Sequence, residues 1–305
     1  MLDLVLIGQG LVDYFCEENG GIIKKFGGVY KKCRVPFKKI DRIITESKIM
    51  HRNIGGCVTN TAVGLNKLNR KCYLVFCVGG DKKGTYFMNN IKKYKNIVPI
   101  VKKCTLNTGV VLTFIKKVDK RDNHLSLYNH GAANNLELTN KLKKMLPRSL
   151  LYISLFSFSE KKYSNLFNIM EYAKRNKATI ILDAGGIAMI SQRRLKKIIQ
   201  ISSGIIANEK EFGYLKKIKS ELAGKWVIIK RGEKPVEFYM NNKLTLRVHI
   251  KKSKEFVNSL GAGDAFAAGF IDKFSKGKSF GVAIKNGNTC AAHIVKKISA
   301  NYVSR

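Results

Sequence analysis

Short apolar runs alternate along the chain with longer stretches in which apolar residues recur at helical spacing. This alternation predicts an α/β fold, with a parallel sheet covered by helices. The apolar runs that we expect to be strands are residues 4–7, 73–78, 150–154, 179–182, 204–207 and 227–230. The stretches that we expect to be helices are residues 59–68, 161–176 (after Ser159 as a plausible N-cap) and 282–296.

Two segments interrupt this alternation. Residues 17–47 are rich in Gly and Lys, with extended patches. Residues 108–130 predict a β-hairpin, with strands at 110–117 and 124–128 around a polar turn at 118–123. Both segments therefore read as strand-like insertions into the α/β pattern.

Length and composition indicate a globular protein. The chain has 305 residues, 45% hydrophobic and 26% charged, enough for one large α/β domain or two small ones. The N-terminus has no basic region, and its apolar run is too short for a signal peptide. No run approaches the roughly 18–20 apolar residues of a membrane span. We therefore expect a cytoplasmic protein with no membrane partner.

The seven cysteines are irregularly spaced, and no pair has the Cys-x-x-Cys spacing of a zinc ribbon or a redox pair. Their odd number favours free thiols in a reducing compartment over a disulfide framework.

The formal net charge of +36 raises the question of nucleic-acid binding. Lysines are spread along the whole chain, mostly as doublets, without a basic tail or an arginine-rich stripe with interleaved aromatics. We therefore expect solvated lysines and no specific nucleic-acid partner, with a charge that favours capture of anionic substrates such as nucleotides.

The most informative stretch is the glycine-rich turn Gly261-Ala262-Gly263, which precedes Asp264 and an apolar helical run at 265–274. Such a turn leaves backbone N–H groups free at the positive end of a helix, where they bind anions. A carboxylate there repels an anion, but it is suited to take a proton from a hydroxyl that attacks phosphorus. The alternative is an ordinary turn with Asp as a helix cap.

A second turn, Gly55-Gly56, is followed by Asn60 at the start of an expected helix. Glycines allow the backbone to approach a polyhydroxylated ligand closely, and Asn offers it both a donor and an acceptor. The alternative is a simple strand-to-helix turn.

These two stretches resemble the two signatures of the PfkB family, the ribokinase-like sugar and nucleoside kinases. In the second signature residues 261–264 and Phe266 match, whereas Asn258 and Ser259 replace the usual Asp-Thr. In the first signature the Gly-Gly pair matches, as does the Asn five residues after the first Gly. The spacing of the two signatures is typical of the family.

The resemblance implies a three-layer α/β/α ribokinase-like fold with a small β-sheet lid. It implies a single domain over residues 1–305, with lid segments at about 14–50 and 105–130. The implied reaction is transfer of the γ-phosphate of ATP, with Mg²⁺, to a hydroxymethyl group of a sugar. Asp264 would be the general base, and the N–H groups of the glycine-rich turn would stabilise the transferring phosphoryl group. A homodimer through the lid strands is plausible.

Other matches to the family lie between the signatures. Asp13, five residues after Gly8, matches an Asp that binds two substrate hydroxyls. Asn208 and Glu211 match the Asn-x-x-Glu motif, in which Glu holds magnesium through water and the motif orients the phosphates. Acidic residues in the first turn of a helix explain the latter pattern almost as well.

The nucleotide-binding residues are less clear. Lys230 stands where Thr is usual, Gly232 matches, and Pro235 replaces a Gly, so that Lys230 or Arg231 would pair with phosphate. Asn286 matches an Asn-bearing helix beside the adenine pocket, although the small residues around it equally suit close packing. His130, near the hairpin, is in a position to touch a substrate, although a solvent-exposed loop residue is the preferred interpretation.

Three functions remain open from the sequence. A sugar kinase is preferred, and a nucleoside kinase of the same fold is second. The third is a catalytically weakened, basic binding protein, which the altered Lys230, Pro235 and Asn258 positions and the charge would suit.

Overall fold

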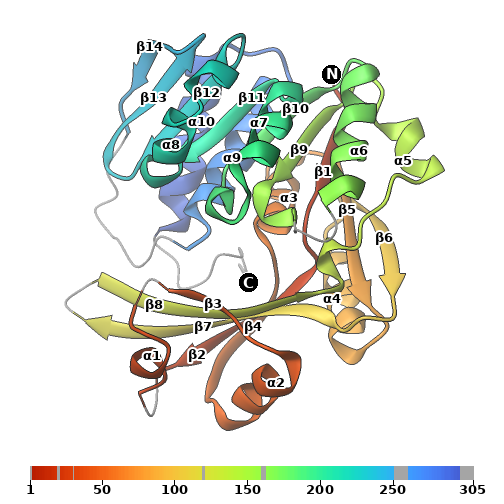
Figure 1. Ribbon diagram of the computed structural model, residues 1–305, viewed down its shortest axis with the longest axis vertical. Helices are drawn as coiled ribbons and strands as arrows, with labels where there is room; N and C mark the ends of the chain where they lie inside the picture. Colours follow the sequence, from red (N-terminus) through yellow and green to blue (C-terminus); the bar gives the residue numbers. More distant parts are fainter. Residues whose placement is uncertain are drawn as a thin grey trace.

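The computed structural model describes residues 2–18, 21–29, 31–118, 121–158, 163–250 and 260–295, with side chains for all of these except 116–118 and 121–123. Its strands form a nine-stranded sheet and a five-stranded sheet (Figure 1). The strands of the larger sheet are β1 (Leu4–Ile7), β5 (Cys72–Gly79), β6 (Ile97–Cys104), β9 (Leu150–Ser154), β10 (Thr179–Asp183), β11 (Gly204–Asn208), β12 (Trp226–Arg231), β13 (Lys234–Met240) and β14 (Lys243–Val248). Their order is β14-β13-β12-β11-β10-β9-β1-β5-β6. The strands from β6 to β12 are parallel, and β13 and β14 extend the sheet as an antiparallel edge.

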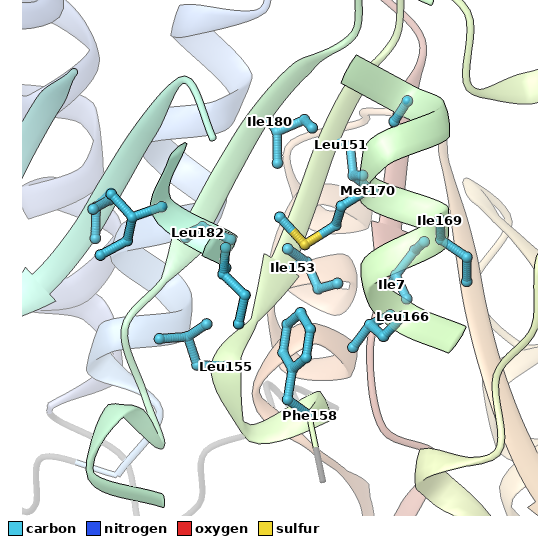
Figure 2. Close-up of a cluster of buried hydrophobic side chains, with 14 of the residues drawn as sticks. Ile7, Leu151, Ile153, Leu155, Phe158, Leu166, Ile169, Met170, Ile180 and Leu182 are labelled. Carbon is cyan, nitrogen blue, oxygen red and sulfur yellow. The ribbon is translucent and has the colours of Figure 1, made fainter. Parts of the chain in front are cut away.

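Helices cover both faces of this sheet and form a three-layer α/β/α body, as the sequence predicts. Helices α5 (Asn140–Met145), α6 (Tyr163–Arg175), α7 (Gln192–Ile201) and α8 (Glu209–Lys216) pack on one face. Helices α3 (Cys57–Lys67), α4 (Lys82–Ile91), α9 (Ala262–Phe274) and α10 (Phe280–Ile294) pack on the other. Strand β1 serves both layers, because Val5 and Ile7 join one buried cluster and Leu4 and Leu6 join the other. Figure 2 shows the first cluster, with Met170 of α6 turned toward the sheet.

The observed elements agree with the predicted ones to within a few residues. All six apolar runs form strands of the larger sheet. The last helix begins two residues earlier than expected, at Phe280, and its described part ends at Ile294. Ser159 and residues 161–162, the expected start of α6, lie outside the described residues, as does Lys296.

The smaller sheet is the lid. Its strands are β2 (Leu11–Glu17), β3 (Lys32–Arg34), β4 (Ile49–Gly55), β7 (Thr108–Val118) and β8 (Arg121–Gly131), in the order β3-β8-β7-β2-β4. In Figure 1 it crosses below the body, with the short helices α1 (Ile22–Lys25) and α2 (Phe37–Glu46) on its outer side. Alternate residues of β2 separate the two faces of this sheet. Val12, Tyr14 and Cys16 pack in the core under the helices, and Asp13 and Phe15 face inward.

Two details of the lid differ from the sequence prediction. The segment at 17–47, expected to be extended, contains the helix α2, which follows Pro36 and packs Ile40 and Ile43 on the lid core. The hairpin turn is also shorter than predicted, because β7 reaches Val118 and β8 begins at Arg121. Helix α2 forms because packing on the lid sheet outweighs its locally polar, Lys-rich sequence. The hairpin strands are longer because their backbone pairing continues as far as Val118 and Arg121.

Short 3₁₀ helices connect the body elements at η1 (Ala132–Asn134), η2 (Leu155–Ser157), η4 (Ile187–Met189) and η5 (Lys219–Leu222). All seven cysteines are free thiols, as expected. Among the described residues, no helix combines the length and the apolar character that a membrane crossing requires.

The topology marks the place of a binding site. Strand β1 lies between β5 and β9, so the chain leaves the middle of the sheet first to one side and later to the other. In open α/β sheets, ligands bind at such a reversal, beyond the carboxyl ends of the strands. Here the inner face of the lid lies opposite those strand ends.

Candidate active site

A cavity of about 310 Å³ lies between the lid and the carboxyl ends of the body strands. Its walls come from segments that are remote in the sequence. The residues that line it are Gln9, Leu11, Asp13, Phe15, Lys32, Gly56, Cys57, Asn60, Val111, Thr113, His124, Ser126, Tyr128, His130, Phe156, Met189, Leu260, Gly261, Gly263 and Asp264. Asp13, Asn60 and Asp264, which the sequence singles out, therefore share one cavity.

Asp264 lies in the first turn of α9. The helix follows Gly261, whose φ of +78° lies in the left-handed region that a side chain would make costly. The amide Nδ2 of Asn60, on α3, donates to Asp264 Oδ2 at 2.9 Å. The other amide atom, Asn60 Oδ1, is buried and accepts no hydrogen bond from any described residue. Asn60 thus orients the carboxylate, and its Oδ1 is an acceptor without a described partner.

Asp13 faces Asp264 from the lid. Its Oδ1 is buried and has no partner among the described residues. Burial, and then the negative charge of Asp264, raise the pKa of Asp13 to about 7. A Cβ atom at Gly55 would collide with the carboxyl group of Asp13, so only glycine fits there. The second glycine, Gly56, has a φ of +101° and abuts the carbonyl of Gln9.

The pKa of Asp264 is likewise raised to about 7. Burial is the largest cause, and the charge of Asp183 adds to it. The hydrogen bond from Asn60 and the charges of Lys230 and Lys32 act in the opposite direction. A carboxyl group with this pKa is suited to accept a proton near neutral pH.

Lys230 brings a cation to the glycine-rich turn. Its Nζ lies 3.8 Å from Asp183 Oδ2, and a Cβ at Gly263 would lie 3.0 Å from that Nζ. Asp183, at the carboxyl end of β10, also accepts from the N–H of Gly185 at 2.9 Å and from the hydroxyl of Tyr152 at 3.3 Å. The ammonium group, the N–H groups of the turn and the helix start form an environment that attracts an anion.

Arg231, the other basic residue that the sequence offers for phosphate, is paired with carboxylates in this structure. Its Nε lies 3.0 Å from Glu209 and its Nη1 lies 2.7 Å from Glu237. Gly232 has a φ of +62°, in the turn from β12 to β13. The turn therefore needs glycine for its conformation, and the arginine is held by two carboxylates.

Asn208 and Glu211 form a capping box at the start of α8. Asn208 Oδ1 accepts from the N–H of Glu211 at 2.9 Å, and Glu211 Oε2 accepts from the N–H of Asn208 at 2.8 Å. This is the structural alternative that the sequence left open. Burial and the charge of Asp183 raise the pKa of Glu211, whereas Lys230 lowers it, so these side chains lie within electrostatic range of one another.

Asn286 faces another helix. Its Nδ2 donates to the carbonyl of Gly269 at 2.7 Å and so ties α10 to α9. Small residues at this contact allow the helices to pack closely, which is the alternative that the sequence left open. Asn258 and Ser259 lie outside the described residues.

Other cavity residues were missed or misjudged from the sequence. His130 was expected on an exposed loop, but it lies in β8 and lines the cavity. Gln9 and Lys32, which line the cavity, and Asp183, which lies beside Lys230 outside the lining, were not singled out. For Asp183 and Gln9 a signal exists, because both lie at or just beyond the carboxyl ends of predicted parallel strands.

Comparison with known proteins identifies the family. The pattern of pfkB family carbohydrate kinases matches residues 36–305. The chain belongs to the pfkB family of carbohydrate kinases. Kinases of this family use ATP as the phosphate donor.

Named relatives of this kinase include two enzymes called 5-dehydro-2-deoxygluconokinase. The one from Clostridium tetani is 24% identical over 287 residues, covering 86% of this chain and 84% of the relative. The one from Bacillus thuringiensis is 24% identical over 325 residues, covering 98% of this chain and 91% of the relative.

Solved structures share the fold. Adenosine kinase from Schistosoma mansoni with 2-fluoroadenosine has a TM-score of 0.84 at 20% identity, covering 99% of this chain and 97% of the other. A probable sugar kinase from Rhizobium etli has a TM-score of 0.84 at 16% identity, covering 99% and 96%. The ribokinase-like fold predicted from the sequence is therefore confirmed.

The two raised pKa values predict an acidic limit for this kinase. Asp13 and Asp264 each have a pKa of about 7, and because they interact these values belong to the pair. Asp264 can take a proton only when it is ionised, and Asp13 accepts charge-assisted hydrogen bonds at both oxygens only in that state, so kcat/KM for the acceptor should fall as pH decreases through about 7. The slope of log kcat/KM against pH should lie between about one and two below pH 6. A flat profile from pH 5 to 8 would contradict this assignment.

Proposed function

We propose that this kinase transfers the γ-phosphate of ATP to a hydroxymethyl group of a sugar. The observation that carries the proposal is the meeting of Asp13, Asn60 and Asp264 in one cavity, next to the glycine-rich turn and Lys230. Asp13 and Asn60 each present a buried acceptor without a described partner, as sugar hydroxyls require. Gly55 and Gly56 leave room for this contact.

In the proposed reaction the acceptor hydroxyl lies between Asp264 and the terminal phosphate of ATP. Asp264 takes the hydroxyl proton while the oxygen forms a bond to the γ-phosphorus and the bond to ADP breaks. The N–H groups of Ala262 and Gly263 and the ammonium of Lys230 stabilise the charge on the transferring group. Lid closure keeps water away from the phosphate.

We further propose that Mg²⁺ is bound near Glu211 and Asp183. The charge of Asp183 raises the pKa of Glu211, which supports their being near one another, and Mg²⁺ is usually held by one or two carboxylates while it keeps several waters. Glu211 Oε2 is used by the capping box, so water-mediated contact suits this residue. When bound, the ion neutralises charge on the phosphates. Among the described residues, no three His, Cys, Asp or Glu side chains form a closed metal site.

The extent of the domain, the nucleotide site and the oligomeric state are also proposals. We propose that residues 1–305 form one kinase domain. We also propose that Asn208, Gly232 and Asn286 support the nucleotide site by shaping the turn and the helices beside it. No specific nucleic-acid partner is proposed. A homodimer through the lid is supported by β4, an edge strand on which Ile49 and Met50 are 40% and 49% exposed.

A nucleoside kinase is the second candidate. The aromatic rings of Phe15, Tyr128 and Phe156 line the cavity and would suit a planar base. The similar structure from Schistosoma mansoni is an adenosine kinase, which supports this alternative through the fold alone.

An ATP-consumption screen tests the proposal. The purified protein with ATP and Mg²⁺ is offered ribose, fructose, gluconate, 5-dehydro-2-deoxygluconate or adenosine, and ADP formation is measured. We expect a sugar or sugar acid to give the highest kcat/KM. Turnover with adenosine alone would favour the nucleoside kinase, and no turnover with any acceptor would overturn both.

A further inference from the structure

A cluster of hydrogen bonds joins the lid to the body at one corner of the cavity. The amide nitrogen of Gln9, just beyond β1, lies 2.6 Å from His130 Nδ1. The same nitrogen lies 2.8 Å from Asn134 Oδ1 and 2.9 Å from the carbonyl oxygen of Phe156. Gln9 is only 5% exposed, and both Gln9 and His130 line the cavity. Neither the expected signatures nor the proposed proton transfer uses this cluster.

The geometry fixes which nitrogen of His130 carries the hydrogen. An amide nitrogen only donates, and the opposite orientation of Gln9 would place its oxygen 2.9 Å from the backbone carbonyl oxygen of Phe156, which cannot donate. His130 Nδ1 must therefore accept. Burial and the charge of Arg34 lower the pKa of His130 to about 4, so the ring is neutral near pH 7. A neutral imidazole that accepts at Nδ1 carries its hydrogen on Nε2.

The Nε2–H group is left for a ligand. No described residue is hydrogen-bonded to His130 Nε2, and the ring lies at the cavity wall. The two hydrogens of the Gln9 amide are shared among three acceptors, which are His130 Nδ1, Asn134 Oδ1 and the Phe156 carbonyl oxygen. The Nε2–H group of His130 is a donor without a described partner, and a carboxylate or carbonyl oxygen of a ligand can accept from it.

The same wall of the cavity is positively charged. Lys32 lines the cavity, and its ammonium lies 4.4 Å from the centre of the Phe156 ring. In the lid sheet Lys32 pairs with Ser126 and Arg34 pairs with Tyr128. Because Ser126 and Tyr128 line the cavity, the side chains of Lys32 and Arg34 project from the cavity face of the sheet. Positive charge beside a donor-only group favours an anionic oxygen over a neutral one.

We propose that His130 Nε2–H and Lys32 bind the carboxylate of the acceptor, so that the preferred acceptor is a sugar acid. Asp13 and Asn60 then hold the hydroxyls at the other end of the same molecule. This inference rests on the proposed kinase function and narrows its acceptor class. It assigns His130 a role in specificity, with Gln9 as the residue that positions it.

The test compares a sugar acid with its uncharged carboxamide analogue. Initial rates are measured for 5-dehydro-2-deoxygluconate and for its carboxamide, which has nearly the same shape. We expect the wild-type KM to be about 10-fold or more lower for the acid. His130→Leu should raise the KM for the acid about 10- to 100-fold and leave the KM for ATP unchanged. His130→Gln keeps an N–H near the position of Nε2, so it should recover part of the loss.

Lys32→Gln provides the second arm, with Lys31→Gln as its matched control. Lys32→Gln should reduce the preference for the acid over the amide, whereas Lys31→Gln should not, because Lys31 does not line the cavity. A fold defect would change the KM for both nucleotide and acceptor, and would also lower Tm.

The outcomes separate this inference from the proposed function. If ribose, fructose or adenosine is preferred to every acid, or if His130→Leu leaves the KM for the acid unchanged, the sugar-acid assignment is wrong while the kinase proposal stands. If no acceptor is phosphorylated, both are overturned.

Discussion

Replacing Asp264 with Asn should lower kcat by about 10²- to 10⁴-fold, the usual contribution of a general base. The substitution preserves shape, and an Asn carbonyl at this position still accepts from Asn60 Nδ2. Only the ability to take a proton is lost. The KM for ATP should change little, since the cation and the N–H groups of the turn remain in place.

The measurement is steady-state ADP formation at pH 8, where the wild-type carboxyl group is ionised. Asp41→Asn is a matched control, because Asp41 lies on the outer helix α2 in a partly exposed ion pair with Lys83. Its kcat should equal that of the wild type. An Asp264→Asn enzyme with more than about a tenth of the wild-type kcat would rule out Asp264 as the base.

Asp13→Asn is expected to lower kcat/KM for the acceptor by about 10²- to 10³-fold. A carboxylate that accepts from two hydroxyls loses charge-assisted hydrogen bonds of roughly 1.5–3 kcal/mol each when it becomes an amide.

The same substitution, Asp13→Asn, should stabilise the protein at pH 8. The folded pKa of Asp13 is about 7, against 3.8 for an ordinary Asp, so the folded state retains a proton that the unfolded state has released.

The difference between the folded and unfolded pKa of Asp13 sets the direction in which stability changes with pH. Between about pH 4 and pH 7 the unfolded state binds fewer protons, so stability decreases as pH rises through this window and stays lower above it. Asn does not titrate and avoids this penalty. Urea unfolding at pH 5 and pH 8 should therefore show a smaller loss of stability with pH for Asp13→Asn than for the wild type. An equal loss in both proteins would show that Asp13 is not buried as a carboxylate.

The sequence was sufficient to predict the strands of the large parallel sheet and the glycine turns at the site. The apolar runs predict the parallel strands because a strand covered on both faces needs apolar residues at consecutive positions, as in β1 and β9. The glycine-rich turn and Gly55 could be recognised because few residue types satisfy a left-handed φ or the close approach of Asp13.

The sequence was not sufficient where a side chain had more than one possible partner. Arg231 is bound by Glu209 and Glu237 only because β13 folds back on β12 and the helix α8 starts beside them. His130 lies about 120 residues from Gln9, so nothing local indicates their hydrogen bond. Helix α2 was missed because its stabilising contacts come from the lid sheet rather than from its own polar face.

The lid has an apolar interior of its own. Twelve buried residues, among them Val12, Ile40 and Leu127, form a cluster separate from the two that hold the body together. Such a module can tilt on its connections without unfolding, since swinging it would not open the body's interior. The inward residues of its strands can also be exchanged without weakening the scaffold that carries Asp264. Acceptor specificity can therefore diverge among these enzymes by substitutions on the inner face of the lid sheet, and a mutational library should begin with those residues.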